Sequence, residues 1–72
     1  MTTKYELQYI DMIRKCKNYR KCQKITQSEV ADSMHVYQQD ICKMETCSNI
    51  PNVIKFLEYL DSIGLKIVLN EV

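Results

Sequence analysis

Apolar residues recur at helical spacing through most of the chain, and the first such segment covers residues 3–23. Its apolar positions fall on one stripe of a helix, with Ile13 beside them: Tyr5, Tyr9, Met12, Cys16 and Tyr19. This spacing of about 3.6 residues predicts a single amphipathic helix whose apolar stripe packs on a core.

Two short helices joined by a tight turn are predicted next, over about 26–46. The first begins at the capping-box pair Thr26 and Glu29. A turn around His35 leads to the second, which opens at Gln38. Apolar positions on both segments share an inward side: Val30, Ala31, Met34, Ile41 and Met44. Together they form a helix-turn-helix pattern.

A fourth helix and a strand complete the expected fold. Pro51 fits the first turn of a helix, and Gly64, the single glycine, fits its end. Between them the apolar positions keep a helical period: Val53, Phe56, Leu57, Leu60 and Ile63. Residues 65–72 then alternate and are rich in branched side chains, which predicts a strand.

No second strand is predicted within the chain, so this strand would leave its backbone groups unpaired. Pairing with the same strand of another subunit across a two-fold axis removes that cost. We therefore expect a helical domain over residues 1–64 and a homodimer formed through residues 65–72. The expected interface side chains are Leu65, Ile67, Val68 and Leu69.

Length and composition favour a binding module over an enzyme. The chain has 72 residues, which leaves little room for a deep substrate pocket beside a core. Catalysis needs a base, a nucleophile and a supporting shell, but the pattern gives the single histidine, His35, no carboxylate or cysteine partner. No apolar run approaches the ~18 residues of a membrane span, and residues 1–6 lack a secretory signal pattern. We expect a cytoplasmic protein with no catalytic residues and no membrane partner.

The four cysteines do not follow a metal-binding pattern. Their spacings are Cys16-x5-Cys22 and Cys42-x4-Cys47, without a CxxC pair, in stretches that predict helix. These spacings disfavour a zinc site, even with His35 as a further ligand. Reduced thiols in or near a core are the simpler interpretation, so neither a metal nor a cofactor is expected.

Positive charge is concentrated in the first helix, although the net charge is only +1. Six basic residues and no acidic residue lie between Arg14 and Lys24, whereas the remaining four lysines face nine acidic residues. Arg14, Lys17 and Lys21 lie opposite the apolar stripe and give the helix a basic outer face. Such a face is either an ordinary solvated surface or a source of attraction for nucleic acid.

The predicted helix-turn-helix resembles the Cro and phage-repressor type, or XRE-like, family of DNA-binding proteins. Ile25-Thr26-Gln27-Ser28-Glu29-Val30-Ala31 is similar to its leucine-Thr-Gln-x-x-Leu-Ala signature, and Ile41 with Met44-Glu45 is similar to its Ile-x-x-(apolar)-Glu ending. The match spans roughly residues 16–64. It implies a mostly α, four-helix or five-helix lambda-repressor-like domain. The strand at residues 65–72 resembles the pairing strand of HipB-like antitoxins.

The resemblance also implies roles for individual residues. Gln38 and Gln39 would read base edges in the major groove, where a carboxamide can bond adenine N6 and N7 together. Lys43, one turn on, would read guanine or touch phosphate. Contacts to the DNA backbone would come from Gln27, Tyr37, Lys24 and Lys21. Arg20 and Glu45 match the pair that ties the first helix to the third, so they are expected to form a structural ion pair.

Several positions depart from the family pattern. Lys24, His35 and Cys47 stand where the family has glycine, so each is expected to take a positive φ. Tyr37 is a poor helix cap, and it either contacts DNA or lies off it. Asp40 either accepts from cytosine N4 or stabilises the N-terminus of its helix, and the second interpretation is favoured.

Two classes of function follow from these residues. The first is a dimeric, sequence-specific transcriptional regulator of prokaryotic or phage origin, a repressor or an antitoxin that also binds a toxin. It would occupy a pseudo-palindromic operator in double-stranded DNA with recognition helices ~34 Å apart. The alternative is a protein-interaction module that keeps the fold and does not bind DNA. A steep salt dependence of binding to duplex DNA distinguishes the first from the second.

Overall fold

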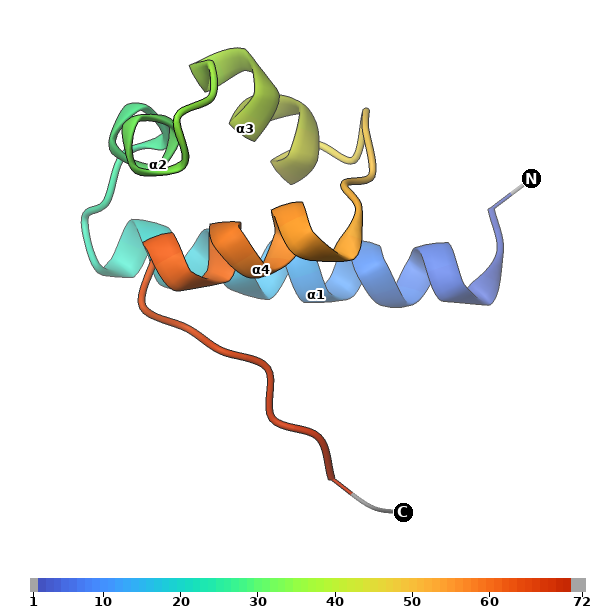
Figure 1. The fold of residues 1–72 in the computed structure, drawn as a ribbon. Coiled ribbons are helices and arrows are strands. Elements are labelled where there is room, and N and C mark those ends of the chain that lie inside the picture. Colours follow the sequence, from blue (N-terminus) through green and yellow to red (C-terminus); the bar gives the residue numbers. More distant parts are fainter. Residues whose placement is uncertain (1, 71–72) are drawn as a thin grey trace.

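The computed structural model describes residues 2–70 and forms four helices in that range. They are α1 (Lys4–Cys22), α2 (Gln27–Met34), α3 (Gln38–Glu45) and α4 (Val53–Ser62). The long α1 and the shorter α4 run in the same direction, and α2 and α3 lie across them on one side (Figure 1). The mostly helical fold is therefore confirmed, with four helices in the described part of the chain.

Polar side chains at the helix starts explain where the first two helices begin. The Thr26 hydroxyl accepts from the Glu29 amide, and the Glu29 carboxylate accepts from the Thr26 amide, both at 3.1 Å. This is the predicted capping box. Thr3 and Glu6 form the same arrangement at the start of α1. Each box satisfies two backbone N–H groups that a helix start would otherwise leave without acceptors.

The start of α4 differs from the prediction. Asn52 is the cap residue, and its Oδ1 accepts from the Lys55 amide at 2.8 Å. Pro51 therefore precedes the cap, and its expected place in the first turn of the helix is wrong. A carboxamide at the cap accepts a backbone hydrogen bond and so stabilises the helix start directly, whereas proline at the first helical position only removes an N–H group that would have no acceptor.

Three residues other than glycine have left-handed backbone conformations at or after helix ends. Lys24, His35 and Cys47 have φ values of 60°, 57° and 63°, as expected for the positions where the family has glycine. His35 is the C-cap of α2, and its amide donates to Asp32 O at 3.3 Å. Left-handed backbone disfavours residues that carry a Cβ, so the surrounding packing must hold these turns.

A single core joins the four helices. Its buried apolar members are Ile13, Cys16, Val30, Ala31, Met34, Ile41, Met44, Phe56, Tyr59, Leu60 and Ile63. All five inward positions predicted for α2 and α3 belong to it. Val36, just before α3, is half-buried against this core, which includes Ile41 in the first turn of the helix.

The buried stripe of α1 is displaced from the predicted one. Ile13, Cys16 and Arg20 are buried, whereas the predicted members Tyr5, Met12 and Tyr19 are exposed. Both stripes have helical spacing, so periodicity alone does not choose between them. The buried stripe includes Arg20, and it could not be recognised from the sequence because charged residues are usually exposed to solvent.

On α4 the same kind of displacement occurs. Val53 and Leu57 were predicted to face the core but are exposed, whereas Tyr59 is completely buried. Phe56, Leu60 and Ile63 are buried as expected. Exposed apolar side chains therefore remain on both long helices.

The predicted C-terminal strand is not present in the described residues. Residues 65–70 carry no regular secondary structure, and residues 71 and 72 of the predicted strand lie outside the described range. The Leu65 amide donates to Leu60 O at 2.8 Å and keeps the start of the segment against α4. Beyond it, Ile67, Val68 and Leu69 are exposed, and the chain extends away from the helices (Figure 1). Within residues 2–70, a single chain offers this segment no second strand to pair with.

Candidate nucleic-acid interface

One side of α3 is anchored in the core, and the other side is open. Ile41, Met44 and Glu45 are buried, whereas Gln38, Gln39, Cys42 and Lys43 are exposed. Tyr37, Gln38 and Gln39 line an open hollow of about 500 Å³ at the start of the helix. The residues predicted to read bases therefore share one exposed surface, and Tyr37 borders it.

Asp40 takes part in the helix start. Its Oδ2 accepts from the Tyr37 amide at 3.2 Å, which satisfies a donor at the N-terminus of α3. This geometry agrees with the interpretation of Asp40 as a stabiliser of the helix N-terminus. The Tyr37 side chain makes no capping hydrogen bond and is 80% exposed. Its ring therefore projects from the surface beside the glutamine pair.

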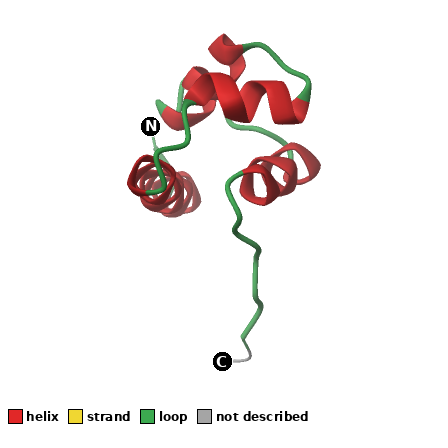
Figure 2. Ribbon diagram, turned by 90° about the vertical axis from the view of Figure 1, so that its left-hand side faces the viewer, coloured by secondary structure: helices red, strands yellow, loops and turns green. Residues whose placement is uncertain are grey.

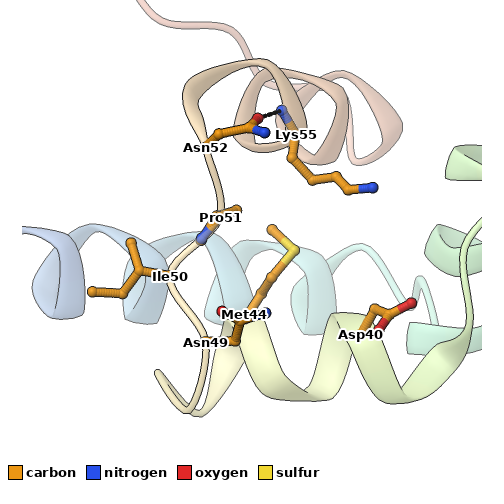
Figure 3. A pocket seen from close by; sticks show the side chains of 7 residues that line it. All are labelled: Asp40, Met44, Asn49, Ile50, Pro51, Asn52 and Lys55. Carbon is orange, nitrogen blue, oxygen red and sulfur yellow. Dashed lines mark hydrogen bonds between the residues drawn. The ribbon is translucent and has the colours of Figure 1, made fainter.

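A second hollow, of about 330 Å³, lies between α3, the loop that follows it and the first turn of α4. Asp40 lines it from α3 and Lys55 lines it from α4, while Asn49 and Asn52 come from the loop (Figure 3). This hollow could not be predicted from the sequence, because its lining comes from three separate segments. Its amide and amine groups extend the polar surface beyond α3.

Glu45 is the acceptor at the centre of a buried network. Arg20 donates from Nε to Oε2 at 2.7 Å and from Nη2 to Oε1 at 2.9 Å. Tyr59 Oη donates to Oε2 at 2.6 Å, and Gln27 Nε2 donates to Oε1 at 2.9 Å. The four residues come from α1, α2, α3 and α4. The expected ion pair is thus present, and it is one part of a junction between all four helices.

The network holds Glu45 ionised. Burial alone would raise the pKa of Glu45, but hydrogen bonds from Arg20, Tyr59 and Gln27 outweigh burial and lower that pKa below its usual value. The bond to Glu45 raises the pKa of Arg20, although burial opposes this change. For Tyr59, burial and the bond to Glu45 both raise the pKa of the phenol. The pair is therefore charged at neutral pH and serves structure.

Gln27 differs from its expected role. The resemblance places its side chain on the DNA backbone, but in the structure the carboxamide nitrogen is bonded to Glu45 and the residue is half-buried. A carboxamide nitrogen carries two hydrogens, so one donor is left after this bond. Gln27 therefore joins the network that supports the open side of α3.

The basic residues of α1 are largely exposed. Lys21 and Lys24, both expected on the DNA backbone, are exposed at the end of the helix and in the turn after it. Lys17 is half-buried. Lys15 pairs with Asp11 at 3.1 Å, but a pair this exposed contributes only ~0.5 kcal/mol. The C-terminal end of α1 therefore presents basic side chains to solvent, as the sequence predicts.

Two residues near the site were missed by sequence reasoning. Tyr59 was not assigned to the core, although its spacing of three from Phe56 and four from Ile63 fits the buried stripe of α4. Cys42 was treated only as a thiol, although it lies one turn after Gln38 and Gln39 on the same exposed side. A helical projection of α3 would have placed it there.

All four cysteines are free thiols, and the described residues form no group of three or more His, Cys, Asp or Glu side chains able to hold a metal ion. Within residues 2–70, each helix is too short or too polar to cross a bilayer. No family model, curated protein or solved structure was found to match the chain.

Proposed function

We propose that the protein is a sequence-specific, DNA-binding transcriptional regulator with a lambda-repressor-like helix-turn-helix domain, as its resemblance to the XRE-like family implies. The observation that carries the proposal is the exposed pair Gln38 and Gln39 at the start of α3, a helix whose opposite side is locked into the core. Residues at the start of a recognition helix reach base edges, and a carboxamide can make two bonds to one adenine. A fixed helix gives these bonds a fixed register.

Charge near α3 supports this proposal. Arg20 faces α3 through its bond to Glu45, and Lys17, three residues earlier, is its neighbour on the helix surface. The basic flank of α1 thus borders α3, where Lys21 and Lys24 would contact phosphates. Lys21 and Lys24 on both copies of a dimer would make roughly four phosphate contacts. With that number of contacts, raising the salt concentration from 50 to 200 mM would weaken DNA binding on the order of a hundredfold. A solvated face without a nucleic-acid partner has no such dependence.

The proposed regulator is a homodimer that acts in the cytoplasm as a repressor by occupying its operator. The molecule measures 34 × 29 × 22 Å, so two copies side by side can present their α3 helices about one turn of DNA, ~34 Å, apart. Pairing of the C-terminal segments, through Leu65, Ile67, Val68 and Leu69, would join the two copies. An antitoxin that also binds a toxin is a variant of the same proposal.

Selection of bound duplexes from a random DNA pool tests the proposal. We expect the wild-type protein to enrich a two-fold motif with half-sites one turn apart, and Gln38→Ala/Gln39→Ala to lose or relax it. The matched control is Gln8→Ala/Asn18→Ala, which removes two exposed carboxamides of α1 that have no predicted contact with DNA and should leave the motif unchanged. Absence of enrichment by a folded wild-type protein would contradict the proposal.

A protein-interaction module is the second candidate. The fully projecting Tyr37, beside the two glutamines, favours it, because exposed tyrosine is common in protein interfaces. This candidate predicts no salt-dependent binding to duplex DNA. The same selection, followed by titration at several salt concentrations, therefore separates the two functions.

A further inference from the structure

We propose that a second copy of the chain covers an apolar surface shared by α1 and α4, and that it does so with its C-terminal segment, residues 65–70. This surface, the α1–α4 apolar face, consists of Tyr5, Met12, Tyr19, Val53 and Leu57. The inference rests on the dimer of the proposed function and names the surfaces that would form it.

On α1, the apolar face lies next to the buried stripe, on the side away from α3. Arg20 marks the side toward α3 through its bond to Glu45. Tyr9 lies between α3 and α4, because its hydroxyl donates to Met44 O at 3.1 Å and its ring meets Phe56 edge-on, with 5.9 Å between the ring centroids. Residues seven apart nearly coincide on a helix, so Tyr5, Met12 and Tyr19 form one line. In the rotation around the helix axis, this line lies next to Tyr9, on the side away from Arg20.

On α4, the order around the helix is similar. Tyr59 marks the side toward α3 through its bond to Glu45, and Phe56 and Leu60 follow around the helix toward α1. Val53 and Leu57 come next in the same rotation and remain exposed. Figure 2 shows α1 and α4 nearly end-on, on either side of the molecule below α2 and α3. The exposed apolar lines of the two helices thus border the side of the molecule opposite α2 and α3.

The C-terminal segment carries the complementary apolar side chains. Ile67, Val68 and Leu69 are exposed, Leu69 by 90%, and Figure 2 shows the segment descending away from both helices. Gly64, with φ of 86°, sets this direction where α4 ends. In the described part of the chain, the apolar face and the apolar segment therefore both stay exposed to solvent. A second copy brings them together without any rearrangement of the helical domain.

The exposed area and the reach of the segment suit such an exchange. Complete covering of the five face residues, Ile67 and Leu69 would bury roughly 700 Å² on each copy, which is within the range of a standard stable interface. Six residues in extended form span about 20 Å, which is enough to cross to a neighbouring copy. These seven side chains carry no charge, so the face of each copy can meet the segment of the other across a two-fold axis without burying a charge, unlike the basic flank of α1.

Strand pairing and this packing are compatible. Leu65 packs against its own core. Beyond it, alternate side chains of an extended segment point to opposite sides, so Val68 lies on one side and Ile67 and Leu69 share the other side. Two such segments that pair through their backbones can lay this side on the helices of the partner copy. The pairing then supplies the hydrogen bonds that residues 66–70 lack within the described part of one chain.

Mass measurement by light scattering tests the exchange with two charged variants. Met12→Lys alters the face and Leu69→Glu alters the segment, and both positions are exposed, so the helical domain should still fold and show an unchanged circular dichroism spectrum. We expect wild-type protein at twice the chain mass of 8.5 kDa, and each variant alone at the single mass. Leu7→Lys is the matched control, because Leu7 is exposed on the opposite side of α1, and it should remain dimeric.

Mixing the two variants tests the exchange itself. In an equimolar mixture, one junction is entirely wild type and the other contains the introduced amine and carboxylate together, so the mixture should recover the doubled mass. A monomeric wild type, a dimeric Met12→Lys or Leu69→Glu protein, or a mixture that stays monomeric would overturn the inference. None of these measurements involves DNA, so a failed DNA selection beside a recovered dimer would reject the proposed function alone.

Discussion

Removal of Arg20 tests whether the Glu45 network holds the fold together. In Arg20→Met, an apolar side chain of similar length replaces the guanidinium and its three hydrogen bonds, two to Glu45 and one to Ile25 O. Tyr59 and Gln27 still donate to the carboxylate, but its charge is left without a cation at a site that is 6% exposed. Breaking one partner of a buried pair costs about 3–5 kcal/mol.

This cost is large for a chain of this size. At ~0.05–0.15 kcal/mol per residue, the whole domain has only about 4–11 kcal/mol of stability. Each kcal/mol shifts the melting temperature of so small a domain by roughly 4–8 °C, so we expect Arg20→Met to melt at least ~12 °C below wild type. Thermal unfolding followed by circular dichroism at pH 7 measures the change. Lys21→Met, which removes an exposed neighbouring charge, is the control and should melt within ~2 °C of wild type.

The pH and a second substitution separate charge from packing. Without Arg20, the pKa of Glu45 should rise, so acidification toward pH 5 should protonate the carboxylate and reduce the loss. Arg20→Met/Glu45→Gln should melt above Arg20→Met, because it leaves no buried charge. An Arg20→Met protein that melts within ~4 °C of wild type, or a double variant that melts no higher than Arg20→Met, would show that the buried ion pair does not stabilise the fold as described.

Three further predictions concern stability. The pKa of Glu45 is lowered in the folded state, so the ionised carboxylate contributes to the free energy of unfolding above its unfolded pKa of ~4.3, and this contribution is lost as pH falls through the folded pKa. Urea unfolding between pH 5 and 3 should therefore show a smaller loss of unfolding free energy for Glu45→Gln than for wild type. Burial raises the pKa of Tyr9 to about 12, so the stability that comes from its neutral phenol is present below pH ~10 and is lost as pH rises toward 12. Tyr9→Phe should remove this part of the loss of unfolding free energy at alkaline pH. An equal loss in both proteins would contradict a raised pKa at Tyr9. His35→Gly should raise the melting temperature by roughly 4–8 °C, since it relieves about 1 kcal/mol of left-handed strain, and a lower melting temperature would show that the histidine side chain stabilises the turn.

Helix starts and turns were predictable because they depend on a few adjacent residues. Thr26 and Glu29 lie three residues apart, and their reciprocal bonds fix the start of α2 locally. The positive φ of His35 was expected because the family that the chain resembles has glycine at this position. Pro51 was misplaced because Asn52, the next residue, supplied a stronger local cap.

The orientation of the long helices was harder to predict because it depends on distant partners. Arg20 is buried only because Glu45, 25 residues later, accepts its hydrogen bonds. Without knowledge of that contact, the aromatic line through Tyr5 and Tyr19 appears to be the core. The ion pair itself was expected from resemblance, but Tyr59 and Gln27 joined it through tertiary contacts that no local pattern encodes.

The junction at Glu45 also bears on the order of events during synthesis. The carboxylate emerges from the ribosome 14 residues before Tyr59, the last of its donors. A nascent chain without α4 would have to bury this charge with an incomplete set of hydrogen bonds and without the apolar side chains of that helix. Cooperative folding should therefore wait until α4 has been made. Shortened translation products that end before Tyr59 should stay open and be degraded quickly by proteases.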